Sequence, residues 1–306
     1  MSEILEHTFE RITFVLPSGP KHVHCWVIEG DGGRMLVDTG MGLPGDEESF
    51  RGLEVDAIVL THMHPDHVGG AQRAAELTGA PVHQFELDYR QCVRVWGSPD
   101  WPERIAEWFL SNGVPRKITD ELIVSGHAFA PSIRFVRDPQ FVAEGNVLDG
   151  WEVLWLPGHA DGHIALHRGG ALVSGDVLLS RISPAVGLYP ESRPDPLGDY
   201  LRTLERIVEL DPRIAYSGHG DPVERPAERA RELVAHHRRR LEQTRDALGR
   251  EPATGYAVSI ALFGTWLSPT QQRFAVAETL SHLERLVIEG AVRREKHGRT
   301  VSYTGT

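Results

Sequence analysis

A histidine-rich segment directly behind a short apolar run constrains this chain more than any other feature of its sequence. The run Val55 to Leu60 is apolar and β-branched enough to form a central strand buried on both faces. The next residues, Thr61-His62-Met63-His64-Pro65-Asp66-His67, crowd three histidines and an aspartate together. Ligands of layered α/β folds gather at strand ends of this kind. Because imidazole nitrogens and carboxylates are ligands of zinc and similar divalent ions, the segment predicts a metal site.

Three more ligand candidates follow predicted strands further along the chain. They are His159 in Pro157-Gly158-His159, Asp176 in Ser174-Gly175-Asp176 and His219 in Ser217-Gly218-His219. A single Gly-His after a strand is more often a turn than a ligand, so each of them alone is weak evidence. Their joint occurrence predicts that they complete a site for two metal ions.

In this order the motifs resemble those of the metallo-β-lactamase superfamily, whose members share a four-layer αββα sandwich. The resemblance covers roughly residues 10 to 224 and implies an α/β fold of that type. It implies that one metal ion is held by His62, His64 and His159, a second by Asp66, His67 and His219, and that Asp176 bridges both. Asp38, in Val37-Asp38-Thr39-Gly40, would orient a ligand histidine.

Details of the resemblance argue against some branches of the superfamily. Asp176 stands where the antibiotic-hydrolysing β-lactamases carry Cys or Ser, which argues against a true β-lactamase. His64 and His67 argue against the diiron flavoprotein branch, in which a carboxylate replaces one of the ligands. The runs Pro157 to His163 and Pro196 to Leu201 and the C-terminal part resemble β-lactamase-like hydrolases that include an endoribonuclease and thioesterases of polyketide pathways.

The resemblance implies a hydrolase that uses a metal-bridging hydroxide. Two adjacent divalent ions lower the pKa of a bound water to near 7, which yields this hydroxide, and they polarise the bond under attack. Asp66 and Asp176 would hold the hydroxide, and His163 would orient a ligand or handle a proton. Zinc is the expected metal, with Mn, Fe and Co as alternatives, because nitrogen and oxygen ligands accept all of them. The expected substrate is an ester, a thioester or a lactone.

The remaining pattern predicts two half-sheets with outer helices and a separate C-terminal part. Strands are expected at residues 11–17, 23–29, 34–38, 55–60, 152–156, 163–167, 171–174 and 214–217. Helices are expected at residues 66–78, twice within 86–112, and at 197–210, 227–249, 258–263 and 271–289. Residues 1–224 would form the catalytic domain, with a helical insertion at about 86–117. Residues 225–306 would form a linker helix and a winged-helix module that ends in a hairpin.

Aromatic residues near the predicted site are candidates for the wall of a substrate pocket. Trp96 and Trp108 lie in the helical insertion, and Tyr189 lies in the segment that follows Asp176. Insertions and loops beside such a site often line it. A place in the hydrophobic core or in a dimer contact is the alternative for the tryptophans.

The charge of the chain is unevenly divided. The formal net charge is −11, yet residues 225–306 carry 14 basic residues against 9 acidic ones. This basic part permits contact with RNA, so a single-strand endoribonuclease with the same metal centre is the alternative function. A winged-helix DNA-binding regulator with a ligand-sensing domain is an alternative of another class. The acidic body discourages binding to an anionic membrane.

The sequence predicts a cytoplasmic protein, and the resemblance implies that it acts on a small acyl substrate. No apolar run is long enough to cross a membrane, and residues 1–6 lack the features of a signal peptide. The two cysteines, Cys25 and Cys92, cannot build a disulfide framework, which favours a reducing compartment. Whether the chain forms a homodimer is left open.

Overall fold

Two β-sheets form the centre of the molecule, and the computed structural model describes residues 9–17, 19–249 and 251–306. The first sheet contains, in spatial order, β1 (Phe9–Val15), β2 (His22–Glu29), β3 (Arg34–Val37), β4 (Ala57–Val59), β5 (Val82–Phe85) and β6 (Gln140–Val142). The second has the order β11-β10-β9-β8-β7, with β7 (Val147–Leu148), β8 (Trp151–Trp155), β9 (Ile164–Arg168), β10 (Ala171–Gly175) and β11 (Ile214–Ser217). Residues 1–6, on which the signal-peptide expectation rests, lie outside the described residues.

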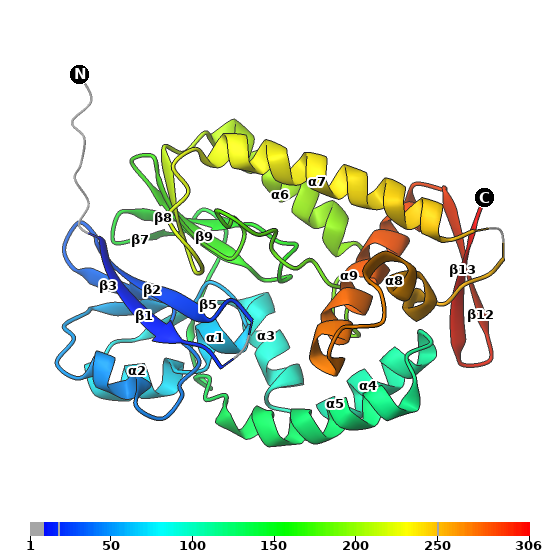
Figure 1. Cartoon of the computed structure of the whole chain (residues 1–306). Coiled ribbons are helices and arrows are strands. Elements are labelled where there is room, and N and C mark those ends of the chain that lie inside the picture. The colour runs from blue at the N-terminus through cyan, green and yellow to red at the C-terminus, as the bar shows by residue number, and fades with distance from the viewer. Residues whose placement is uncertain (1–8, 18, 250) are drawn as a thin grey trace.

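Helices cover the outer faces of these sheets and build the C-terminal part. They are α1 (Pro65–Val68), α2 (Ala71–Thr78), α3 (Glu86–Val95), α4 (Trp101–Ser111), α5 (Arg116–Phe129), α6 (Pro196–Leu210), α7 (Pro226–Ala247), α8 (Gly255–Phe263) and α9 (Pro269–Ile288). A hairpin of β12 (Val292–His297) and β13 (Thr300–Gly305) ends the chain. Figure 1 shows α2 outside the first sheet and α6 and α7 outside the second. Within the described residues, no helix has both the length and the apolar character needed to cross a bilayer.

Alternating side chains of the strands build two cores. Trp26 and Ile28 of β2 share one core with Ile164 of β9, so this core lies between the sheets. Cys25 and Val27 alternate with them and belong to the other core, which also contains residues of α2 and α6. This arrangement confirms the α/β sandwich that the resemblance implied.

The region predicted as one helix at 66–78 is instead two helices, because glycines interrupt it. A Cβ atom at Gly69 would lie 2.3 Å from the carbonyl oxygen of Met41, and one at Gly70 would lie 2.3 Å from that of Thr39. Only glycine lets the loop that follows β3 approach the backbone this closely. The break between α1 and α2 therefore follows from a contact that is distant in sequence.

Two further elements differ from the sequence-based expectation. Helix α5 extends the helical segment beyond the predicted limit at 117, to Phe129. Its apolar stripe is short, since Thr119 and Leu122 are its buried residues and Val124 is exposed. Strand β6 lies outside the strands expected from the sequence, and it pairs in parallel with β5 in the first sheet. Strand pairing of this kind depends on tertiary contacts rather than on local pattern.

The C-terminal part has the predicted order of helices followed by a hairpin. Helix α9 begins at Pro269, two residues before the predicted start, behind a capping box formed by Ser268 and Gln271. Gly290 follows the helix in the left-handed conformation with φ of 75°. The identification of this part as a winged helix stays a prediction.

A buried histidine pair joins α7 to α9. His237 Nδ1 and His282 Nε2 lie 3.3 Å apart, and both side chains are fully buried. His282 Nδ1 donates to the Glu278 carbonyl, so His282 Nε2 accepts from His237. Burial lowers the pKa of His237 to about 3 and that of His282 to about 4. Both rings are therefore neutral in the folded chain at pH 7.

We expect this pair to make the fold sensitive to acid. The folded-state pKa values lie below the 6.5 of an unperturbed histidine, so the unfolded chain binds more protons below pH 6.5. The free energy of unfolding should therefore fall as the pH drops from 6.5 toward 4, by up to about 1.4 kcal/mol per pH unit for each histidine. Urea denaturation of wild type and His237→Gln at several pH values measures this, because glutamine keeps a donor but does not titrate. Equal pH slopes for the two chains would contradict the expectation.

Candidate metal centre

The predicted metal ligands come from loops at strand ends of both sheets. His62 and His64 follow β4, and Asp66 and His67 lie in α1. The loops after β8, β10 and β11 supply His159, Asp176 and His219. The structure brings these side chains together in three overlapping groups, within each of which the ligand atoms lie within 4.8 Å of one another: His62, His64 and His159; His62, His67 and Asp176; Asp66, His67 and His219.

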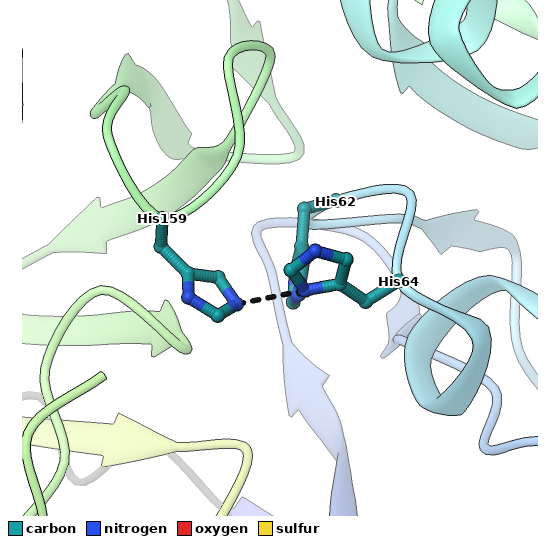
Figure 2. Close-up of side chains that lie close together, drawn as sticks. All are labelled: His62, His64 and His159. Carbon is teal, nitrogen blue, oxygen red and sulfur yellow. Dashed lines mark hydrogen bonds between the residues drawn. The ribbon is translucent and has the colours of Figure 1, made fainter. Parts of the chain in front are cut away.

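The first group is built from three imidazole rings. His64 Nδ1 lies 3.0 Å from His62 Nε2 and 2.8 Å from His159 Nε2. Figure 2 shows the His159 ring reaching across from its own loop toward the two rings on the opposite loop. Burial lowers the pKa of His64 to about 3 and also lowers the pKa values of His62 and His159. These imidazoles are therefore neutral at pH 7, as metal binding requires.

Hydrogen bonds on the far side of these rings decide where their lone pairs point. The Thr61 hydroxyl donates to Asp38, so its oxygen accepts from His62 Nδ1 at 2.9 Å. His159 Nδ1 donates to the Ala185 carbonyl at 2.8 Å. Both rings consequently direct an Nε2 lone pair toward His64 Nδ1. A single proton cannot satisfy three converging ring nitrogens, whereas a divalent cation can.

Asp66, His67 and His219, together with Asp176, form what we call the second ligand group, which combines histidines with carboxylates. His67 Nδ1 donates to Asp38 Oδ2 at 2.7 Å, and His219 Nδ1 donates to the His22 carbonyl at 2.6 Å. Their Nε2 atoms face Asp176 Oδ2 at 3.5 and 3.0 Å. His67 Nε2 and Asp176 Oδ1 are buried and have no hydrogen-bond partner among the described residues. Buried polar atoms without a partner are costly, and a cation would satisfy both.

Electrostatics also favour a cation in this second group. Burial alone would lower the pKa values of His67 and His219, but the surrounding carboxylates, of which Asp176 acts most strongly, together outweigh burial and raise both pKa values. The pKa of His219 rises to about 10. The negative potential that attracts a proton to these rings would equally attract a divalent ion.

Asp38 is hydrogen-bonded to residues that belong to or support both ligand groups. It accepts hydrogen bonds from the Thr61 backbone nitrogen at 2.8 Å, from the Thr61 hydroxyl and from His67. Its backbone has a φ of 63°, a strained value for a residue that is not glycine. Asp38 thus bonds His67, which its predicted role requires, and the role of orienting a metal ligand stays a prediction.

Removal of the Asp38 carboxylate should weaken metal binding without removing a ligand. We expect Asp38→Ala to bind Zn²⁺ roughly 10- to 100-fold more weakly, because His67 and Thr61 lose their acceptor. Competition with a chromophoric chelator measures the affinity. Asp56→Ala is the matched control, since Asp56 is exposed and bonds the Arg34 backbone away from the cluster. Equal affinities of Asp38→Ala and the control would contradict this role.

His163 lies next to the cluster and contacts the backbone of a ligand residue. Its Nε2 accepts from the Asp176 backbone nitrogen at 3.1 Å, and its ring stacks on that of His62 at 4.7 Å. The lone pair of the ring is therefore already engaged. Of the two roles predicted for His163, this geometry favours orienting Asp176 over handling a proton.

The predicted pocket residues lie in two different places. Trp96 donates from Nε1 to the Met63 carbonyl at 2.9 Å, directly between the ligands His62 and His64. The rings of Trp108 and Tyr189 lie 6.5 Å apart, with Tyr189 in the segment that also supplies the Ala185 carbonyl. A pocket role for these residues stays a prediction.

Sequence reasoning missed several groups that hold the ligands in place. The His22 and Ala185 carbonyls accept from ligand histidines, and no sequence pattern marks a backbone acceptor. Thr61 carries a signal in retrospect, because its hydroxyl stands directly before His62. Asp88 is also new: it accepts from the Met63 backbone nitrogen at 2.8 Å.

Comparison with known proteins agrees with this geometry. Residues 18–219 match the family model of the metallo-beta-lactamase superfamily, and residues 241–304 match that of the metallo-beta-lactamase-like C-terminal domain. The probable metallo-hydrolase YqjP of Bacillus subtilis (strain 168) is 30% identical over 308 residues, which cover 92% of each chain. A hydroxyacylglutathione hydrolase of Methylobacillus flagellatus is 28% identical over 216 residues, or 70% of this chain and 68% of the relative. The crystal structure of a metallo-beta-lactamase family protein, TTHA1429 from Thermus thermophilus, superposes with a TM-score of 0.84 and 35% identity, covering 97% of this chain and 98% of the other.

Proposed function

We propose that this chain, which belongs to the metallo-beta-lactamase superfamily, is a hydrolase that cleaves an ester, thioester or lactone bond at a centre of two metal ions. Its relatives and its cluster of histidines and aspartates make it a metallo-hydrolase. The number of ions and the bond cleaved are the proposal. The observation that supports it best is the pair of adjacent ligand groups whose ring lone pairs point inward.

The donor set fits two ions. His62, His64 and His159 would hold the first, and Asp66, His67 and His219 the second. Asp176 Oδ2 lies 3.7 Å from His159 Nε2 and 3.0 Å from His219 Nε2, so this carboxylate would join the two positions. Zinc suits such nitrogen and oxygen donors, and Mn, Fe and Co are alternatives. Divalent ions at such a site supply Lewis acidity toward a carbonyl and make water acidic enough to react near neutral pH.

The chain's own groups prepare the reaction by holding charge and geometry. The Asp66 side chain is 18% exposed, and its Oδ2 lies 3.4 Å from His219 Nε2. This carboxylate can therefore accept a hydrogen bond from the attacking water while it stays anchored in α1. His163 holds the backbone of Asp176, which fixes the direction of that carboxylate. The attack would then use groups that are already in position.

A small acyl compound is the substrate that the comparisons support best. The hydroxyacylglutathione hydrolase among the relatives is named for cleavage of an acyl group carried on glutathione. An acyl group on a thiol is a thioester, which places this bond first among the three. The two buried free thiols, Cys25 and Cys92, support a cytoplasmic location as part of the proposal.

A substrate panel tests the function. The chain is stripped with a chelator, reloaded with Zn²⁺ and assayed on an S-acyl glutathione, an aryl ester and an acyl homoserine lactone. We expect hydrolysis of at least one of them that disappears in the stripped chain and returns with Zn²⁺. A Zn²⁺-loaded chain that hydrolyses none of them, or a stripped chain that stays fully active, would contradict the proposal.

The basic C-terminal part supports RNA cleavage as a second candidate function. Arg238, Arg239 and Arg293 are exposed and make no ion pair within the described part of the chain. Two other basic residues of this part are neutralised, since Arg294 pairs with Glu284 and Arg299 with Glu107. Cleavage of a labelled single-stranded RNA at a rate that falls steeply as the salt concentration rises would favour the endoribonuclease. Tight duplex binding in a gel shift would favour the regulator.

A further inference from the structure

The peptide between two ligand histidines is held on both sides by residues of one helical segment. The Met63 backbone nitrogen donates to Asp88 Oδ1 at 2.8 Å, and its carbonyl accepts from Trp96 Nε1 at 2.9 Å. Asp88 lies in the first turn of α3, and Trp96 directly follows the last residue of that helix. Because Met63 separates His62 from His64, these two bonds hold the backbone from which the two rings project.

Asp88 is itself firmly held. Its side chain is fully buried, and Gln84 Nε2 of β5 lies 2.6 Å from its Oδ2. Burial raises the pKa of Asp88 to about 8. A protonated Asp88 can donate to the amide oxygen of Gln84 once the amide is turned around, and that oxygen otherwise has no partner among the described residues. A neutral side chain of the same shape should therefore be able to replace this aspartate.

The same turn of α3 also touches the loop that carries the third histidine. A Cβ atom at Gly162 would lie 2.4 Å from the backbone nitrogen of Asp88 and 2.5 Å from its Cβ. Gly162 stands three residues after His159, between that ligand and His163. The start of α3 is therefore packed against both loops that form the first ligand group.

We propose that Asp88 and Trp96 are positioning residues that set the spacing of His62, His64 and His159, and thereby the affinity of that one metal position. The proposal rests on the proposed function, which places a metal ion there. Neither residue touches a ligand side chain in the contacts described above, so each would act through the backbone of Met63. The second ligand group does not depend on these two bonds, because Asp38 and the His22 carbonyl hold its histidines.

Metal titrations of matched variants test this role without any substrate. Apo forms of wild type, Asp88→Ala, Asp88→Asn and Trp96→Phe are titrated with Co²⁺, which reports binding through its visible spectrum, and with Zn²⁺ against a chelator. Asp195→Ala is the control, because Asp195 caps α6 and bonds Arg285 rather than Met63. Circular dichroism and Tm report the folding of every variant.

We expect Asp88→Ala to bind one of two equivalents roughly 10- to 100-fold more weakly, with the other equivalent unchanged. Asp88→Asn should stay within about threefold of wild type, since an amide can accept from Met63 and donate to Gln84. Trp96→Phe should weaken the same equivalent as Asp88→Ala. The control variant should have a lower Tm than wild type but the same metal affinity.

Three results would overturn the proposal. One is wild-type affinity for both equivalents in Asp88→Ala and Trp96→Phe. Another is equal weakening of both equivalents in Asp88→Ala, and the third is an Asp88→Asn variant as weak as Asp88→Ala despite a folded spectrum. A wild type that binds two equivalents but hydrolyses no acyl substrate would contradict the proposed function alone, because the titration measures positioning independently of substrate.

Discussion

Replacement of Asp176 by alanine is expected to lower kcat/KM by roughly 10³-fold or more and to leave the chain with fewer than two metal ions. Asp176 Oδ2 faces His67, His159 and His219, so this carboxylate is the group that joins both ligand groups. Its loss also leaves the positive potential of any bound ions uncompensated. Metal analysis by mass spectrometry and the acyl hydrolysis assay measure the two effects.

An exposed aspartate beside the site is the control for this variant. Asp221 lies two residues after His219, its side chain is 68% exposed and it pairs with Arg181. Asp221→Ala should therefore retain the metal content and the activity of wild type. An Asp176→Ala chain that keeps both ions and more than a tenth of the activity would show that Asp176 does not bridge the centre.

Gly218→Ala is expected to produce the second large effect, because no side chain fits at this position. A Cβ atom at Gly218 would lie 2.5 Å from Asp176 Oδ1 and 2.6 Å from His67 Cε1. The added methyl group must displace one of these two ligands from the space between them. We expect a loss of roughly 10²-fold in kcat/KM, together with weaker Zn²⁺ binding measured by chelator competition.

Gly32→Ala is the matched control for the added methyl group. A Cβ atom at Gly32 would have its nearest neighbour at 3.8 Å, an ordinary contact with Asp149. This control should bind Zn²⁺ like wild type. Wild-type affinity in Gly218→Ala would mean that Asp176 or His67 can move aside and that the site is less rigid than the structure indicates.

The convergence of the predicted ligands could be expected from sequence because these residues are chemically distinctive and follow strands. His62, His64, Asp66 and His67 stand in one short segment, and the strand before them places this segment at the edge of the first sheet. The later ligands each follow a strand in the other sheet, so strand ends alone bring them near. The three groups of converging ligand atoms are where the structure places these residues.

The groups that hydrogen-bond to the predicted ligands or to their backbone were not predictable in the same way. The carbonyls of His22 and Ala185 act through their backbone, so the identity of the side chain carries no signal. Asp88 looks like an ordinary residue of an amphipathic helix, and its bond to Met63 arises from the packing of α3 against a loop 25 positions away. The bond from the Trp96 indole nitrogen to the Met63 carbonyl was not predictable either, and the predicted place of Trp96 in a pocket wall stays a prediction.

Secondary structure was predictable where local signals agree. Strand β11 lies at the expected residues 214–217, and α6 starts only one residue before the predicted start, behind the cap of Asp195. The helix expected at 66–78 breaks because the chain that follows β3 approaches Gly69 and Gly70. Strand β6, which was not among the expected strands, forms through its parallel pairing with β5 in the first sheet. Both differences come from contacts that local sequence does not encode.

Titration of the apo chain with Zn²⁺ tests the central claim most directly. The chain is freed of metal, and Zn²⁺ is added in steps while bound metal and hydrolysis of the S-acyl glutathione are measured on the same sample. We predict saturation at two equivalents per chain, with full activity only as the second equivalent binds. Saturation at one equivalent with full activity, or activity in the metal-free chain, would contradict a centre of two metal ions.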